Sequence, residues 1–464
     1  MQQSTAAFVK TDEIRLRFSK AMSDMYKSEV PLYGDLLTLV NAVNEAVLAD
    51  PTALAKQLSE TDELHRLSVE RHGAIRLGTP EELNMMRRML AVMGMLPVGY
   101  YDLSVAGVPV HATAFRPIHE EALKACPFRL FTSLLRPELI SDENARTLSL
   151  ALLAKRDIFS SRVRELIIHF EERSGLSADE TQEFIHEAVQ TFKWHTQSTA
   201  TRDEYHTLNE QHRLLADIAG FKGPHINHLT PRTLDIDRVQ QAMPDFGIVP
   251  KAFIEGPPPR QCPILLRQTS FKALEEAIAF ANESAEQGRH TARFGEVEQR
   301  GIALTRAGRK LYDQLLQQAR GTHGVSHASA DRYVEALNQA FSQFPDDYET
   351  LRIARLAYFN YRVVERARPE LRDLQGDCSA DVLIEKGYLI ADPLIYEDFL
   401  PVSAAGIFQS NLGSGTHGDY QIPPNQDAFE AALGSRVVDE ISLYEAAQAN
   451  SLQVAIARLK ELAC

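Results

Sequence analysis

Apolar residues recur at spacings of three and four along most of this chain, as in amphipathic helices. In the clearest stripe the apolar residues are Leu32, Leu36, Leu39, Val40, Val43 and Val47. The same pattern predicts helices over 143–157, 159–173, 177–194, 271–287, 304–319, 329–343, 348–367 and 427–447. Ser177 precedes Glu180 by three residues, so we expect a capping box at the start of its helix. A chain with this pattern is restricted to folds in which helices predominate.

Strand-like segments are few and lie far apart in the sequence. Runs bounded by Gly and Pro predict strands over 98–103, 108–115, 245–255, 263–269, 291–297 and 404–410. Helical segments separate these strands, and no repeat of 20–50 residues indicates a solenoid. We therefore predict an α+β fold in which residues 1–464 form a single discontinuous catalytic unit. Its β segments would lie near 98–115, 245–269, 291–297 and 404–410, with helical elaborations between them.

Composition excludes several classes of protein. The chain has 49 Lys and Arg against 63 Asp and Glu, a net charge of −14 without a basic run, so neither nucleic acid nor an anionic membrane surface is an expected partner. Its longest apolar run, residues 89–101, is shorter than the roughly 20 residues of a membrane helix. The N-terminal residues lack the pattern of a secretory signal, and the four cysteines are widely spaced. We expect a cytoplasmic protein with reduced thiols.

Three of the 15 histidines lie two residues before an acid, a spacing that some iron sites use. These pairs are His119 with Glu121, His169 with Glu171, and His417 with Asp419. The first two lie in helical patterns, where side chains two residues apart point away from each other. The third lies in a Gly/Ser-rich loop over 413–418, which leaves open both a cupin-like centre and an ordinary solvated histidine.

Other segments place histidines and acids in more restricted settings. His225 and His228 lie three apart beside Gly and Pro, and in an extended chain they would point to opposite faces. Glu296 lies in a predicted strand, where alternation would put Phe294, Glu296 and Glu298 on one face. A buried carboxylate is costly unless it is paired or binds a metal. A solvated face and a site both remain open for this segment.

His72 and Arg76 lie four residues apart and would share one face of a helical turn. The histidine could bind a metal and the arginine a substrate carboxylate, although an exposed polar turn is also consistent with the segment. Together, His72, His228 and Glu296 would form a two-histidine, one-carboxylate set, which leaves positions open on octahedral iron(II). Spacing alone does not select these residues from the other histidines and acids.

Several long motifs resemble those of the 2-oxoadipate dioxygenase/decarboxylase family, also called hydroxyglutarate synthase. They are ERHGAIR (70–76), GYYDL (99–103), GVPVHATAFRP (107–117), FKGPHINHLTPRTLDID (221–237), PILLRQTSFKAL (263–274), HTARFGEVEQRG (290–301) and YEDFLPVSAAGIFQSNL (396–412). The resemblance extends from about residue 10 to about residue 450. It implies a small β-rich core of the vicinal-oxygen-chelate type, decorated by helices.

The resemblance also implies a reaction and its residues. Iron(II) would be held by His72, His228 and Glu296, and 2-oxoadipate and dioxygen would become D-2-hydroxyglutarate and carbon dioxide, a step of lysine breakdown. The substrate-binding residues would be Arg76, Val402, Ser403 and Gln268, with His225 behind the metal ligands. Three alternatives remain: a zinc or manganese isomerase or hydrolase on the same fold, a metabolite-binding protein without activity, and a cupin-like centre at His417.

Overall fold

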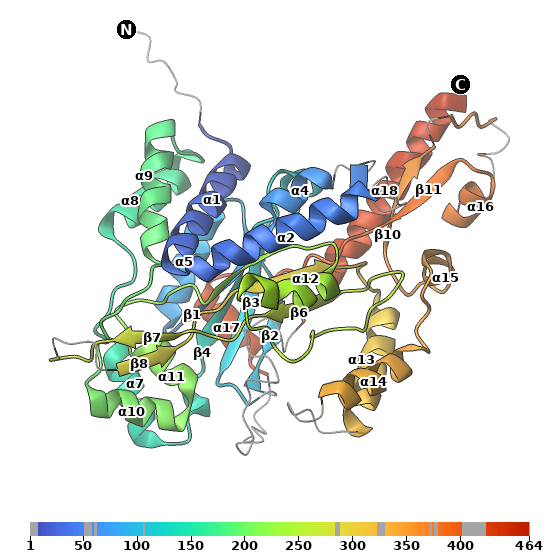
Figure 1. Ribbon diagram of the computed structural model, residues 1–464. Coiled ribbons are helices and arrows are strands. Elements are labelled where there is room, and N and C mark those ends of the chain that lie inside the picture. The colour runs from blue at the N-terminus through green and yellow to red at the C-terminus, as the bar shows by residue number, and fades with distance from the viewer. Residues whose placement is uncertain are drawn as a thin grey trace, which may run out of the picture. The chain divides into compact units, whose positions relative to one another are not determined.

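The computed structural model describes residues 8–50, 58–59, 63–104, 107–283, 288–322, 330–364, 366–370, 374, 379–400 and 424–463 (Figure 1). The chain divides into two compact units, each assembled from separate segments. The first consists of Met1–Lys251, Gln268–Glu298 and Pro401–Val438, and the second of Ala252–Arg267, Gln299–Leu400 and Asp439–Cys464. Within the described ranges, no helix is both long and apolar enough to cross a membrane.

A five-stranded sheet of order β2-β3-β4-β1-β5 lies in the first unit. Its strands are β1 (Arg71–Leu77), β2 (Leu96–Asp102), β3 (Val110–Arg116), β4 (Arg129–Leu135) and β5 (His228–Pro231). β1 is parallel to β4 on one side and antiparallel to β5 on the other. Every residue of β3 and β4 is buried, as expected where both faces of a sheet are covered. The shorter strands form the pairs β6 (Leu266–Ser270) with β9 (Glu296–Arg300), and β7 (Glu275–Ile278) with β8 (Gly288–Thr291).

Amphipathic helices make up most of the rest of the first unit. They are α1 (Thr11–Glu29), α2 (Pro31–Ala49), α4 (Leu64–Val69), α5 (Pro80–Ala91), α6 (Glu120–Ala125), α7 (Glu143–Leu153), α8 (Ser161–Arg173), α9 (Ala178–Gln190), α10 (Arg202–Gln211), α11 (Arg213–Ala219), α12 (Ile236–Ala242) and α17 (Gln426–Leu433), with 3₁₀ turns η2 (Pro137–Leu139) and η3 (Met243–Phe246). Phe18 of α1 is fully buried, and its ring meets those of Phe128 and Phe192 edge-on at 5.8 and 5.7 Å. Such aromatic contacts fix α1 in the core.

The second unit is built mainly from helices and one hairpin. Its elements are α13 (Arg306–Thr322), α14 (Ala330–Phe341), α15 (Tyr348–Ile353), α16 (Ala380–Glu385), α18 (Glu440–Ala463), β10 (Phe359–Val363) and β11 (Leu389–Pro393). The strands β10 and β11 pair antiparallel. Leu459 of α18 packs in one apolar cluster with Leu383 of α16 and Leu389 of β11. This cluster gives the second unit a core of its own.

Most of the predicted helices are confirmed, with their ends shifted by a few residues. The predictions over 32–47, 143–157, 159–173, 177–194, 304–319 and 329–343 correspond to α2, α7, α8, α9, α13 and α14. The capping box is confirmed: Glu180 N–H donates to Ser177 Oγ at 3.3 Å, and Ser177 N–H donates to the Glu180 carboxylate at 3.0 Å. Helical periodicity is a strong signal here because each stripe covers a complete helix face.

Three predicted helices are wrong or only partly right. The segment 271–287 contains β7, because pairing with β8 overrides a short apolar repeat. In 348–367, helix α15 ends before Arg355, whose φ of +53° cannot continue a helix, and β10 follows. The segment 427–447 is two helices rather than one, since Gly434 adopts φ +75° after α17.

The strand predictions are confirmed in part. β2 and β3 lie at the expected 98–103 and 108–115, and β6 forms the later half of 263–269. The segment 291–297 instead falls mostly between β8 and β9. The strand expected over 245–255 is wrong, because Pro244 and Gly247, with φ +69°, favour the turn η3. The strand expected over 404–410 lies outside the described residues.

The capping box gives a stability prediction. Replacing Ser177 by Ala removes the acceptor for the Glu180 amide, and N-cap losses of this kind cost about 1 kcal/mol in the free energy of unfolding. Urea denaturation followed by circular dichroism measures the change. The control is Ser161→Ala, at the exposed first residue of α8, one position after its cap Ser160. Equal stabilities of the two variants would contradict the capping role.

Candidate metal centre

The register between β1 and β5 brings two histidines to one face of the sheet. Ala74 lies opposite His228, and His72 lies opposite Thr230. Because side chains alternate along a strand, residues 72 and 74 share a face, and their partners on β5 share it too. His72 therefore lies on a strand and not on the helical turn that its spacing suggested, and it is 1% exposed rather than on an exposed turn.

Glu296 is the first residue of β9, whose backbone runs beside β5. The Thr233 N–H donates to Glu298 O at 2.7 Å, and Arg232 and Glu298 form a parallel bridge. The Phe294 N–H donates to Asn227 O at 3.0 Å on the approach to both strands. β9 is thereby fixed next to the strand that carries His228.

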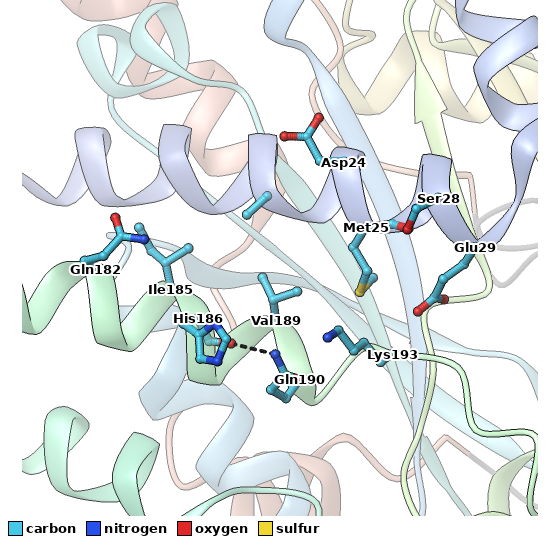
Figure 2. Close-up of a pocket in the computed structure, with 11 residues that line it drawn as sticks. Asp24, Met25, Ser28, Glu29, Gln182, Ile185, His186, Val189, Gln190 and Lys193 are labelled. Atoms are coloured by element: carbon cyan, nitrogen blue, oxygen red, sulfur yellow. Dashed lines mark hydrogen bonds between the residues drawn. The ribbon is translucent and has the colours of Figure 1, made fainter.

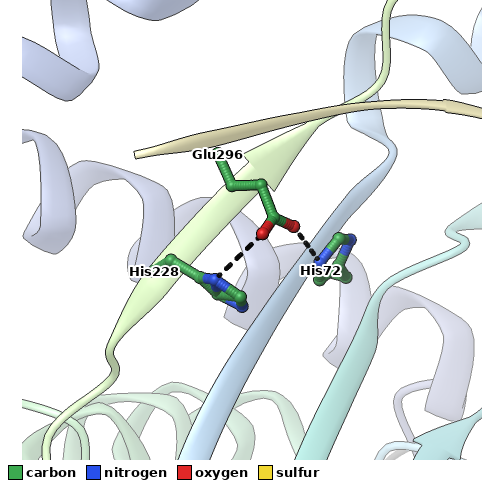
Figure 3. A group of neighbouring side chains, drawn as sticks. All are labelled: His72, His228 and Glu296. Carbon is green, nitrogen blue, oxygen red and sulfur yellow. Dashed lines mark hydrogen bonds and ion pairs between the residues drawn. The ribbon is translucent and has the colours of Figure 1, made fainter. Parts of the chain in front are cut away.

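His72, His228 and Glu296 come together as a buried group in which their candidate ligand atoms lie within 4.8 Å of one another (Figure 3). His72 Nε2 is 3.0 Å from Glu296 Oε1, and His228 Nδ1 is 3.7 Å from Glu296 Oε2. The two rings meet edge-on at 5.4 Å. His228 and Glu296 are completely inaccessible to solvent.

The Glu296 carboxylate is held through one of its two oxygens. Gln268 Nε2 donates to Oε1 at 2.6 Å, and Thr230 Oγ1 donates to the same atom at 3.1 Å. With His72 this makes three contacts on Oε1, whereas Oε2 has no hydrogen-bond partner among the described residues. The arrangement fixes the carboxylate plane and directs Oε2 toward the His228 ring.

The two histidines have opposite electrostatic settings. Burial lowers the pKa of His72, but Glu298, whose carboxylate lies 2.9 Å from Nδ1, and Glu296 raise it by more, so the net pKa is raised. Burial lowers the pKa of His228 well below its usual value, and the charges of His72 and Arg76 lower it further. His228 is therefore neutral, which is the form of histidine that binds a metal.

Unpartnered polar atoms test whether these residues suit a metal. Both ring nitrogens of His228 and Oε2 of Glu296 lack hydrogen-bond partners among the described residues, although both side chains are fully buried. Buried polar atoms are normally satisfied, because leaving them unpaired costs free energy. A divalent cation would satisfy imidazole nitrogen and carboxylate oxygen together, so the donor set fits one.

Arg76 lies on the same face of β1 as His72, since the two are four residues apart on one strand. Its Nη1 donates to Asp217 Oδ2 at 2.6 Å, and both side chains are nearly buried. Asp217 belongs to a second group of buried ligand-type residues, with His225 and His290. His228 belongs to the first group and His225 to the second, so only one of these two histidines is in each group.

The other predicted residues have different positions. His169 pairs with Glu180 on the helix surface, and Glu171 pairs with Arg88, so these residues do not meet at a metal site. His119 is the N-cap residue of α6. Two predicted pocket residues, Val402 and Ser403, lie outside the described residues, as does His417.

Sequence reasoning did not single out Thr230, Asp217, His290 or Tyr26 as parts of these clusters. Tyr26 Oη of α1 lies 2.7 Å from Phe294 O and 2.9 Å from Asn227 O, between the segments that lead into β9 and β5. Asp217 is a buried acid in the short helix α11. In the sequence it is an acid within an apolar run, and this could have marked it as a candidate. The tyrosine gave no comparable signal.

Gly73 of β1 lies in tight contact with residues 226–229. A Cβ at this position would lie 2.5 Å from Ile226 Cδ1 and 3.0 Å from His228 O. Any side chain would therefore push away the residues that lead into β5. The glycine between His72 and Ala74 thus favours the packing of the His228 segment on β1.

A separate surface hollow of about 520 Å³ lies along α1 and α9 (Figure 2). Asp24 and Glu29 of α1 and His186 of α9 are among the side chains that line it, together with Lys193. The Gln190 side-chain amide donates to the His186 carbonyl at 3.2 Å, an ordinary contact within one helix turn. Neither buried histidine group lines this hollow.

The model of the family described as 2-oxoadipate dioxygenase/decarboxylase matches residues 18–411. The chain belongs to this family. A family member from Pseudomonas putida is 55% identical over 96% of this chain and 97% of its own, and one from Escherichia coli is 52% identical over 96% and 98%.

The fold is also that of a solved family structure. The hydroxyglutarate synthase of Pseudomonas putida, in complex with 2-oxoadipate, superposes with a TM-score of 0.90 at 54% identity. The match covers 98% of this chain and 99% of that one. Membership of the 2-oxoadipate dioxygenase/decarboxylase family is thus supported by sequence and by structure over nearly the whole chain.

The donor set predicts stabilisation by a divalent metal. At a free metal concentration 100 times Kd, binding to the native state alone would add about 2.7 kcal/mol to the free energy of unfolding. Melting curves of the metal-free protein, with and without added iron(II) under anaerobic conditions, measure this effect. His228→Gln should abolish it, whereas His169→Gln, a histidine in a surface ion pair, should keep it. A shift that persists in His228→Gln would place the metal elsewhere.

Proposed function

We propose that the protein is an iron(II)-dependent dioxygenase that decarboxylates 2-oxoadipate to D-2-hydroxyglutarate. The single observation that carries the proposal is the buried His72, His228 and Glu296 set, in a chain 55% identical to a named 2-oxoadipate dioxygenase/decarboxylase. Two histidines and one carboxylate suit iron(II) and leave coordination positions open. Bound iron would offer those positions to the keto acid and dioxygen, and would pass to dioxygen the electrons that the oxo acid gives up.

The reaction balances without a second organic substrate. One 2-oxoadipate and one dioxygen give one 2-hydroxyglutarate and one carbon dioxide, so six carbons enter and six leave. One oxygen atom completes the new carboxylate and the other becomes the hydroxyl. The family resemblance further supports a place for this step in lysine breakdown.

The residues around the set would hold and orient the reactants. Gln268 and Thr230 fix Glu296 through Oε1, which directs Oε2 to the metal position. Arg76 would bind the carboxylate of 2-oxoadipate remote from the keto group, because the keto acid end faces the metal and a guanidinium offers paired donors to a carboxylate. We also assign Val402 and Ser403 to the substrate pocket, on the family resemblance. Burial of the set excludes water from the reacting atoms.

We further propose that the strands around the set derive from a vicinal-oxygen-chelate core. β1, α5, β2, β3 and β4 follow in βαβββ order apart from the short helix α6 between β3 and β4, and β1 is parallel to β4. β5 and α12 begin a second such series, in which Arg232, directly after β5, bridges Glu298 of β9 in parallel. His72 and His228 would be equivalent residues on the first strand of each series. We propose that all the discontinuous segments act as one catalytic unit, in line with relatives that match over nearly the whole chain.

Dioxygen uptake tests the reaction. Iron(II)-loaded protein should consume one dioxygen for each 2-hydroxyglutarate formed from 2-oxoadipate, measured with an oxygen electrode and mass spectrometry. Product formed without dioxygen consumption would indicate an isomerase or hydrolase on this fold. Substrate binding without turnover in the iron-loaded protein would indicate a metabolite-binding protein.

Arg76→Gln tests the substrate contact. Loss of a charge-assisted hydrogen bond costs about 1.5–3 kcal/mol, so kcat/KM for 2-oxoadipate should fall by about 10- to 100-fold. Turnover of 2-oxohexanoate, which lacks the remote carboxylate, should change little. Arg156→Gln is the matched control, since Arg156 is a buried arginine paired with Glu82 at 2.7 Å. Equal losses with both oxo acids would contradict the contact.

A further inference from the structure

Asp217 is the centre of a buried group that surrounds the proposed substrate arginine. Its Oδ2 accepts from Arg76 Nη1 at 2.6 Å. Its Oδ1 lies 3.0 Å from His290 Nε2 and 3.2 Å from His225 Nε2. Both oxygens of the carboxylate are therefore occupied by nitrogen donors from three separate segments of the chain.

Tyr205 contacts His290 on the side away from Asp217. Tyr205 Oη lies 2.7 Å from His290 Nδ1, while Nε2 faces the Asp217 carboxylate, which only accepts. A proton on His290 Nε2 would therefore face the Asp217 carboxylate, and Nδ1 lies within hydrogen-bond distance of the tyrosine hydroxyl. This gives a chain of hydrogen bonds from Tyr205 through His290 and Asp217 to Arg76.

Trp194 closes the side of this group. Its ring stacks on His290 at 5.8 Å and meets His225 edge-on at 4.7 Å, and the Arg293 guanidinium lies 4.6 Å from the tryptophan ring centre. Asp217 and both histidines are buried. The imidazoles therefore have little freedom to turn away from the carboxylate.

Two assignments are possible for such a group, a second metal site or a support for Arg76. The first group keeps one carboxylate oxygen, Glu296 Oε2, without a hydrogen-bond partner among the described residues, whereas both Asp217 oxygens have a nitrogen atom within 3.2 Å. Arg76 brings a fixed positive charge to within 2.6 Å of the carboxylate, which would repel a cation. Support for Arg76 is the assignment that agrees with these contacts.

We propose that Asp217, held by His290 and His225, is a positioning residue that orients Arg76 toward the carboxylate of the oxo diacid. The proposal rests on the function assigned above to Arg76. A guanidinium is planar, so a short charged contact at Nη1 restricts the rotation of the whole donor plane. Orientation set before binding reduces the ordering that the substrate must impose.

The test is Asp217→Asn, which keeps the size of the side chain and removes its charge. We expect KM for 2-oxoadipate to rise about tenfold, the equivalent of losing one hydrogen bond to a charged group, with kcat and bound iron little changed. Glu82→Gln is the matched control: it removes the charge of another buried acid paired with an arginine, Arg156, and should lower stability but leave KM unchanged.

A double-mutant cycle separates positioning from general support of the fold. In an Arg76→Gln background, Asp217→Asn should raise KM no further, because the residue it acts through is gone. Additive effects would overturn the proposal, as would loss of the bound iron in Asp217→Asn with KM retained. If Asp217→Asn does not fold, Tyr205→Phe removes one hydroxyl from the outer end of the chain of hydrogen bonds and should raise KM about threefold.

The outcomes also distinguish the two proposals from each other. If Arg76→Gln leaves KM unchanged, the substrate role of Arg76 fails and the role of Asp217 fails with it. If Arg76→Gln raises KM but neither Asp217→Asn nor Tyr205→Phe does, Arg76 binds substrate without the proposed support. If the protein binds 2-oxoadipate but takes up no dioxygen, the oxygenase reaction is rejected. The positioning role is then tested by the same double-mutant cycle with Kd for 2-oxoadipate in place of KM.

Discussion

The antiparallel pairing of β1 with β5 is the contact on which the rest of the candidate centre depends. It joins residues 71–74 to residues 228–231, and its register sets which side chains face Glu296. Because side chains alternate along a strand, a slip of one residue would turn His228 to the opposite face. The histidine pair is therefore a property of the sheet, and Gly73 leaves room for the Ile226 side chain beside it.

Buried ion pairs reinforce the same register. Glu70, just before β1, contacts Arg129 of β4 and Arg232 after β5, each at 2.9 Å. All three side chains are almost inaccessible to solvent. Breaking such a pair leaves an uncompensated buried charge and typically costs about 3–5 kcal/mol. In a misaligned sheet several of these charged side chains would be buried without a partner. The ion pairs therefore favour the one alignment that also forms the histidine group.

The sequence predicts the helices well because each amphipathic stripe is a local signal. It predicts the strands less well: β1 reads as a helical turn, since His72 and Arg76 share a face at a spacing of four in either structure. The sequence also does not predict β7, because the conformation of this segment depends on its pairing with β8. Local periodicity carries no information about such pairing.

The residues of the candidate site also differ in how far the sequence predicts them. His72, His228 and Glu296 could be assembled from residue chemistry, but only the family resemblance selected them from many equivalents. Asp217 lies in no recognisable motif. Its proposed role depends on its contact with Arg76, which is 141 positions away in the sequence. Contacts between distant segments therefore account for most of what the sequence did not reveal.

The wide separation of the three candidate ligands has a consequence for how the protein would bind a metal. His72 and Glu296 are 224 positions apart, so closing the loop between them is slow and entropically costly in an unfolded chain. During synthesis, a ribosome that has produced both histidines has not yet made the carboxylate that completes the set. Metal capture should therefore follow folding instead of directing it, and the supply of metal would limit activation of the finished protein without limiting its folding.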